Sequence, residues 1–177
     1  MNFKNLQQDI FYAVKEEQIK LGYRKETIRL YYPEKSLCRL LEKDMNTRQL
    51  GEALDEFNLS IENEIGTLSH FRSGERFCLC ISPELTQYVH ENTENHGFLY
   101  ELIDAVAGHL GIDAIKAVFE KYSDKVHFEA IDTEEFDYLI YFEDKKPDES
   151  YFCFKAEGHH ITYHRFAKVE YEAMMSE

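Results

Sequence analysis

The sequence predicts an α+β fold, in which helices pack on antiparallel sheets. Apolar side chains recur every three or four residues through much of residues 3–21, 34–57 and 83–122, a spacing typical of amphipathic helices. After residue 124, apolar and polar residues alternate in successive stretches, weakly in the first of them, which indicates a three- or four-stranded antiparallel meander. The chain has 177 residues, of which 44 % are hydrophobic, so it has enough apolar material to form a core.

Residues 1–82 are expected to form a first lobe with the order helix, strand, helix, helix, hairpin. Gly22 caps the first helix, because glycine tolerates the left-handed backbone that a helix end often needs. Pro33 ends the strand and opens the next helix, since it lacks a backbone donor but fits a first helical turn. Asn46 and Gln49 form a capping-box pattern for a further helix. The expected elements are helices at 3–21, 34–43 and 47–57 and strands at 27–32, 65–71 and 76–81.

The last two strands of this lobe are predicted to pair as a hairpin around a Ser-Gly turn at residues 73–74. This turn places His70 opposite Phe77, while Cys78 and Cys80 share the other face of the hairpin. A zinc site normally needs four ligands, and this register separates the histidine from the two thiols. The pair of cysteines is therefore expected to bind no metal.

Histidines are the other candidate metal ligands. His160 and His164 are expected on one strand, where residues four apart lie about 13 Å from each other, too far to ligate one ion. None of the four cysteines belongs to a Cys-x-x-Cys pair, so reduced thiols are expected. The sequence thus predicts a protein with no metal and no other cofactor.

The order of elements over residues 3–81 resembles a winged-helix domain. The helix at 47–57 takes the place of the recognition helix, and residues 72–75 take the place of the wing tip. The resemblance implies either DNA binding or a scaffold for protein contact. In the first case Arg48, Gln49 and Arg72 are the residues that would reach the DNA. Three acidic residues follow Arg48 on the same helix and repel phosphates.

Residues 83–177 are predicted to form a second lobe that packs against the first. Ser82, Pro83 and Glu84 are a strong helix start, with a capping serine, a proline in the first turn and an acid beside it. The expected helices are at 83–91, 98–110, 113–122 and 167–175, and the expected strands are at 125–131, 136–142, 151–156 and 160–166.

The net charge of the chain is −14, and it is distributed unevenly. Residues 1–82 hold 12 Lys and Arg against 13 Asp and Glu, whereas residues 83–177 hold 8 against 21. A strongly acidic surface repels the phosphates of nucleic acid. Binding of nucleic acid is therefore disfavoured. The uneven charge also predicts two lobes, a nearly neutral one and an acidic one, whose surfaces meet different surroundings.

The densest group of arginines and tyrosines lies after the first helix and on the following strand. Arg24, Arg29 and Tyr31 are candidates for protein contact, because Arg and Tyr are enriched in binding hot spots. Strand alternation places Arg29 and Tyr31 on the face away from Ile28 and Leu30. The alternative is that Tyr31 packs under the second lobe and Arg29 pairs with one of the acids there.

Motifs of common enzyme classes are missing from the sequence. It contains no GxSxG, GxxxxGK[ST], GxGxxG or HExxH. The sequence does not exclude a catalytic pair of carboxylates between the lobes, because such a pair is recognised by its geometry in the folded protein. The leading prediction is a non-enzymatic protein-interaction or regulatory protein with an unknown protein partner. The first alternative is a DNA-binding winged-helix protein, and the second is an enzyme with a site between the lobes.

The N-terminal residues show no basic region followed by an apolar block, and no stretch approaches the ~20 apolar residues of a membrane helix. A cytoplasmic location without a membrane partner is expected. The run KEEQIKLGYRKETIRLYYP, residues 15–33, resembles a family of small uncharacterised proteins from Gram-positive bacteria. The resemblance implies a bacterial, cytosolic setting and assigns no activity.

Overall fold

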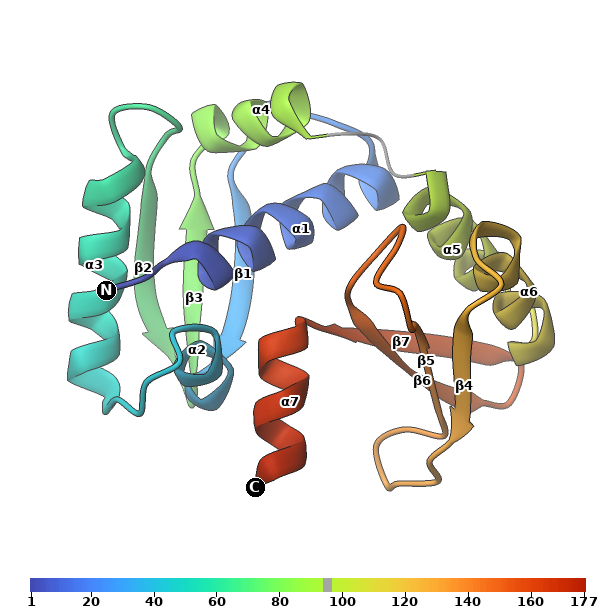
Figure 1. Cartoon of the computed structure of the whole chain (residues 1–177). Coiled ribbons are helices and arrows are strands. Elements are labelled where there is room, and N and C mark those ends of the chain that lie inside the picture. Colours follow the sequence, from blue (N-terminus) through green and yellow to red (C-terminus); the bar gives the residue numbers. More distant parts are fainter. Residues whose placement is uncertain (94–96) are drawn as a thin grey trace. The chain divides into compact units, whose positions relative to one another are not determined.

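The computed structural model describes residues 1–93 and 97–177, and this part of the chain contains seven helices and two antiparallel sheets (Figure 1). The predicted α+β class is confirmed. The chain divides into two compact units, residues 1–94 and 95–177, and each unit holds one of the sheets. None of the described helices is both long and apolar enough to cross a lipid bilayer.

The first unit has the predicted order of helix, strand, helix, helix and hairpin, followed by one more helix. Its strands form an antiparallel sheet in the order β1-β3-β2. The winged-helix likeness of this lobe stays a prediction. The elements are α1 (Lys4–Leu21), β1 (Ile28–Pro33), α2 (Glu34–Leu40), α3 (Thr47–Ile61), β2 (Leu68–Ser73), β3 (Arg76–Ile81) and α4 (Pro83–Asn92).

A local signal sets the start of helix α3, and packing sets its end. The Asn46 side chain accepts a hydrogen bond from the backbone N–H of Gln49 (2.9 Å), and the Gln49 side chain accepts one from the backbone N–H of Asn46 (3.0 Å). This is the predicted capping box. The helix runs past its predicted end at Phe57 to Ile61, because Ile61 is buried and continues the apolar stripe one turn further.

The turn between β2 and β3 differs from the prediction. Its two central residues are Gly74 and Glu75, and His70 therefore lies opposite Leu79 and not opposite Phe77. Gly74 has φ +63°, which suits glycine at the first central position of a two-residue hairpin turn. The register is shifted by two residues, and side chains alternate with a period of two, so the predicted faces are unchanged. The two thiols of β3 still lie on the face away from His70.

Helix α4 packs on α1 and is grouped with the first unit. The side-chain Nε2 of Gln18 donates to the backbone oxygen of Thr86 (2.9 Å), and Tyr23 stacks on His90 with ring centroids 3.8 Å apart. The predicted lobe boundary between residues 82 and 83 lies before this helix, whereas the compact unit extends through it. The physical reason is this packing, which ties the helix to the preceding elements.

The second unit has two helices, four strands and a last helix. The strands follow one another in the order β4-β5-β6-β7, which is the predicted antiparallel meander. The elements are α5 (Gly97–Ala107), α6 (Ile112–Tyr122), β4 (Val126–Ala130), β5 (Tyr138–Phe142), β6 (Tyr151–Glu157), β7 (His160–Phe166) and α7 (Lys168–Ser176).

Apolar side chains pack on both faces of the second sheet. On one face, Phe98 of α5 and Phe119 of α6 pack against the strand residues Phe142 and Phe152, with ring centroids between 4.9 and 5.8 Å apart. Helix α7 covers part of the other face. The residues packed there include Leu139, Cys153 and Phe166 of the strands and Tyr171 and Met174 of α7.

Candidate functional site

Helices of the first unit cover one face of its sheet. On this face Tyr32 donates a hydrogen bond to Asp9 of α1 (2.8 Å), and Nε2 of His70 lies 2.8 Å from Oδ1 of Asp55 on α3. Most side chains of the opposite face are exposed. We call this opposite surface the open face, and it consists of Arg29, Tyr31, Pro33, Ser69, Phe71, Ser73, Arg76, Cys78 and Cys80.

An aromatic row crosses the open face. Cys78 on the central strand pairs with Tyr31 on one side and with Phe71 on the other. Tyr31 is 50 % exposed and Phe71 is 47 % exposed, whereas Cys78 between them is fully buried. Large aromatic side chains that stay half exposed on the two sides of a small buried residue are typical of contact surfaces.

The open face carries positive charge and no acid. Arg29 and Arg76 are both exposed, and the strand register places them on either side of the aromatic row. The chain as a whole has a net charge of −14. The open face therefore differs in sign of charge from the rest of the protein.

The structure brings Arg24 and Arg29 together at one small pocket. It has a volume of about 200 Å³, and its other lining residues include Glu17, Glu26 and Gln18. Gln18 is 7 % exposed, and its Oε1 is buried without a hydrogen-bond partner among the described residues. Arg29 thus belongs both to this pocket and to the open face.

Each of the three candidate DNA-binding residues contacts a group within the chain. Nε of Arg48 lies 3.0 Å from Oε1 of Glu52, although the Arg48 side chain is 88 % exposed. Gln49 completes the capping box at the start of α3. Arg72 at the hairpin tip forms an ion pair with Glu34 at the start of α2. DNA binding by these residues stays a prediction.

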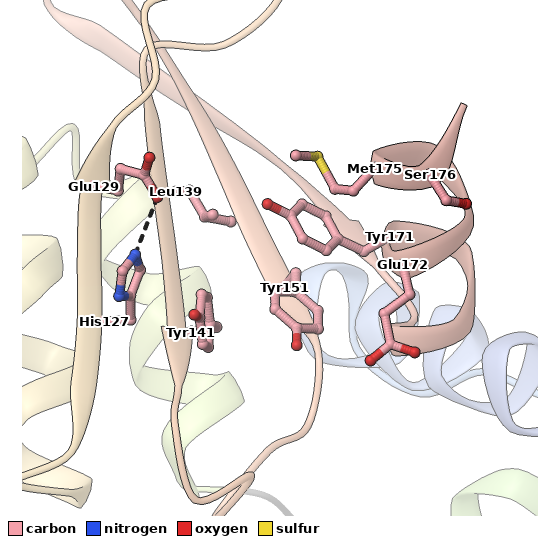
Figure 2. Close-up of a pocket in the computed structure, with 9 residues that line it drawn as sticks. All are labelled: His127, Glu129, Leu139, Tyr141, Tyr151, Tyr171, Glu172, Met175 and Ser176. Atoms are coloured by element: carbon pink, nitrogen blue, oxygen red, sulfur yellow. Dashed lines mark hydrogen bonds and ion pairs between the residues drawn. The ribbon is translucent and has the colours of Figure 1, made fainter.

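The second unit holds a cleft of about 390 Å³ between its sheet and α7 (Figure 2). The buried side chain of Leu139 contributes an apolar wall, and most of the other lining residues are aromatic or polar. We call this cleft the tyrosine cleft. It is lined by His127, Glu129, Leu139, Tyr141, Tyr151, Tyr171, Glu172, Met175 and Ser176.

Four aromatic rings form a continuous row along the tyrosine cleft. The ring centroids are 4.7 Å apart for His127 and Tyr141 and 4.6 Å apart for Tyr141 and Tyr151. Tyr151 then stacks on Tyr171 at 4.3 Å, with ring planes only 6° apart. The rings come from three adjacent strands and from α7, so the row depends on the sheet order and on the packing of the last helix.

The charged residues that line the tyrosine cleft are carboxylates. Oε2 of Glu129 lies 3.1 Å from Nε2 of His127. Glu172 is paired with Lys168 one turn earlier on α7 (3.7 Å), and this lysine does not line the cleft. A ligand in the cleft therefore meets two carboxylates and, among the described residues that line it, neither Lys nor Arg.

The hydroxyls of Tyr141 and Tyr171 in the cleft stay protonated at neutral pH. Burial raises the pKa of Tyr141 above its ordinary value, and the carboxylates of Glu143 and Glu129 raise it further. Burial likewise raises the pKa of Tyr171. Protonated phenols can donate as well as accept hydrogen bonds, so they supply the cleft with neutral polar groups.

None of the cleft residues is among the site residues predicted from the sequence. One signal is present, because Tyr141 and Tyr151 lie on two expected strands that are neighbours in a meander, where their side chains can meet on one face of the sheet. Tyr171 gives no such signal. Its place beside Tyr151 follows from the packing of α7 on the sheet, which the local sequence pattern does not contain.

No metal site is found in the part of the chain that the structure describes. No three His, Cys, Asp or Glu side chains of residues 1–93 and 97–177 are grouped so that they could hold an ion. The four cysteines are free thiols. Nδ1 of His160 lies 3.2 Å from Nδ1 of His109, in an exposed pair of rings.

Comparison with known proteins identifies the family of the chain and no activity. No curated protein and no solved structure matches it. Residues 3–175 match the family described as "Domain of unknown function, E. rectale Gene description (DUF3877)". This match extends over nearly the whole chain and agrees with the resemblance seen at residues 15–33. The chain therefore belongs to this family of uncharacterised bacterial proteins, whose domain has no known function.

Proposed function

We propose that this protein is a non-enzymatic interaction protein that binds an acidic partner polypeptide through the open face. The observation that carries the proposal is the aromatic row, in which Tyr31 and Phe71 stay half exposed on the two sides of Cys78. Aromatic side chains contribute much of the binding energy of protein interfaces, because each buries a large area with little loss of conformational freedom.

The charge of the open face supports an acidic partner. Arg29 and Arg76 border the aromatic row, and an arginine can bind a carboxylate through two parallel hydrogen bonds. The net charge of the chain is −14, and its acidic residues lie outside the open face, where they repel an acidic polypeptide from other surfaces. Such a distribution of charge directs the partner to one face and sets its orientation there.

Site-specific photo-crosslinking tests this proposal. The photoreactive residue p-benzoylphenylalanine replaces Tyr31 in one variant and Phe71 in another, and each full-length variant is irradiated in a bacterial extract. We expect both positions to cross-link to the same acidic protein, because they lie on the two sides of one row. Adding Arg29→Glu and Arg76→Glu to either variant should abolish that product.

Two further positions serve as controls for the cross-linking. Leu59 on α3 is 66 % exposed and Tyr100 on α5 is 62 % exposed, and neither belongs to the open face. If the photoreactive residue at these positions captures the same protein as at Tyr31, or if the charge reversals leave the product unchanged, the open face is not the binding surface.

DNA binding and an enzymatic role, the two alternative functions predicted from the sequence, are tested by separate experiments. DNA binding requires a gel shift at low salt that Arg48→Ala removes, and an enzymatic role requires a measured turnover. Neither is supported by a feature as specific as the aromatic row. A cytoplasmic location is part of our proposal, and the four free thiols support it, since cysteines of reducing compartments are commonly unpaired.

A further inference from the structure

The tyrosine cleft has the size and composition of a small-molecule site. Its volume of about 390 Å³ is sufficient for a small metabolite and too small for a folded polypeptide segment. Figure 2 shows side chains of strands β4, β5 and β6 along one side and side chains of α7 along the other. A ligand between them contacts both the sheet and the last helix.

The polar groups of the cleft select the charge of such a ligand. Glu129 on β4 and Glu172 on α7 come from the two opposite sides, and the part of the chain that the structure describes contributes neither lysine nor arginine to the lining. A carboxylate or phosphate ligand would therefore be repelled by both carboxylates and would meet neither lysine nor arginine among the described lining residues. A positively charged ligand would be attracted from both sides.

The aromatic rings favour an organic cation over a metal ion. The faces of tyrosine rings carry negative potential and attract ammonium groups, with about 0.5–2 kcal/mol gained for each well-placed contact. A bare metal ion needs three or more ligands such as His, Cys, Asp or Glu side chains. No such group of three is found among the described residues. An alkylated or protonated amine, in contrast, is satisfied by ring faces and one or two carboxylates.

We propose that the tyrosine cleft binds a small organic cation, whose ammonium group lies against the rings of Tyr141 and Tyr171, in the field of Glu129 and Glu172, and whose apolar part faces the apolar wall of the cleft. Leu139 and Met175 extend the apolar wall for that part of the ligand. This site lies in the second unit, and it does not depend on the proposed use of the open face.

Calorimetric titration of the full-length protein with choline tests the proposal. The matched neutral probe is 3,3-dimethylbutan-1-ol, in which a carbon atom replaces the charged nitrogen. We expect choline to bind and the neutral probe to bind roughly three- to thirtyfold more weakly, as a single cation–π contact implies. Ethanolamine as a third probe distinguishes a site for alkylated ammonium groups from one for primary amines. Equal binding of choline and its neutral analogue, or no binding of any cation at millimolar concentration, overturns the proposal.

Charge-neutral variants locate the site. Glu129→Gln and Glu172→Gln alter side chains that are 55 % and 58 % exposed, so both variants should fold. Each should weaken choline binding at least about threefold. Glu120→Gln is the control, because Glu120 forms the same kind of pair with Lys116 on α6 (3.6 Å) that Glu172 forms with Lys168. If all three variants bind choline as well as the parent does, or if choline shifts no amide resonance of β4, β5 and α7 in NMR spectra, the assignment to this cleft is wrong.

Discussion

Asp137 is a single side chain that ties two strands of the second sheet together. It precedes β5, and its Oδ2 accepts a hydrogen bond from the backbone N–H of Ala156 on β6 (2.8 Å), while Nζ of Lys155 lies 3.3 Å from Oδ1. The hydrogen bond from Ala156 lowers the pKa of Asp137, and the ion pair with Lys155 lowers it further. The ionised carboxylate is therefore favoured in the folded protein.

Replacing this carboxylate should make stability less dependent on pH. The pKa of Asp137 is lower in the folded protein than in the unfolded chain. The ionised carboxylate therefore contributes its full stabilisation of the fold at pH values above the ordinary pKa of about 3.9. This contribution is lost as the pH falls through the lower pKa of the folded state. We expect Asp137→Asn to be less stable than the parent at pH 7 and to approach it at low pH, in urea unfolding followed by circular dichroism. The exposed Glu134→Gln in the same loop is the control. A stability difference for Asp137→Asn that is the same at pH 7 and below pH 3 contradicts this account of its hydrogen bond.

Strand alternation was enough to predict the faces of Arg29 and Tyr31, because the period of two is a local property. It was not enough for Arg24, whose place at a pocket beside Arg29 depends on the path of the loop between α1 and β1. The partners of Arg72 also needed the fold, since Glu34 is far away in the sequence.

Among the secondary-structure elements, the hairpin of β2 and β3 shows which features are local. The alternation of apolar and polar residues predicts the two strands and which side chains share a face. A turn at residues 73–74 and a turn at residues 74–75 differ by a register shift of two, so both place the same side chains on the same face. The cross-strand partners distinguish them, since the observed register pairs His70 with Leu79 and Phe71 with Cys78. Helix caps, in contrast, are encoded within four residues, which is why the starts of α3 and α4 were predicted correctly.

Gly66 sets the path of the chain between α3 and β2. It has φ +137°, and a Cβ atom there would lie 2.6 Å from the backbone nitrogen of Leu85 and 2.9 Å from its Cα. Both contacts are with the backbone of α4, which cannot rotate away as a flexible side chain can. A side chain at this position must therefore displace the start of α4.

Two alanine substitutions separate steric clash from backbone strain. Gly74→Ala places a Cβ at φ +63° with nothing within 4 Å, and it should cost about 1–2 kcal/mol of unfolding free energy through strain alone. Gly66→Ala adds the clash with α4, so we expect a clearly larger loss, measured by chemical unfolding of both full-length variants. Equal losses for the two variants would show that α4 does not approach Gly66 as closely as described.

Across the whole chain, the two units differ in charge and in the surface that each presents. Residues 1–94 hold 12 Lys and Arg against 16 Asp and Glu, a net charge of −4, and residues 95–177 hold 8 against 18, a net charge of −10. The open face lies in the less acidic unit and the tyrosine cleft in the more acidic one. This distribution agrees with an acidic partner for the first surface and a cationic ligand for the second.

The asymmetry of charge could be read from the sequence, because counting needs no structure. The tyrosine cleft could not, because its row of rings joins three strands to a helix that follows them, and only the packing of α7 brings Tyr171 to Tyr151. The compact first unit also extends beyond the predicted lobe, since α4 packs back on α1.

Charge reversal on two surfaces of the first unit decides whether the open face binds the partner. Isothermal titration compares Arg29→Glu with Arg48→Glu against the acidic protein that cross-links at Tyr31, at 0.15 M and then at about 0.5 M salt, where screening is stronger. Both arginines are exposed, but only Arg29 lies on the open face, whereas Arg48 lies at the start of α3. We predict that Arg29→Glu raises the Kd about tenfold or more, that this effect shrinks at the higher salt, and that Arg48→Glu leaves the Kd nearly unchanged. A larger loss of affinity for Arg48→Glu than for Arg29→Glu would contradict the assignment and point to helix α3 instead.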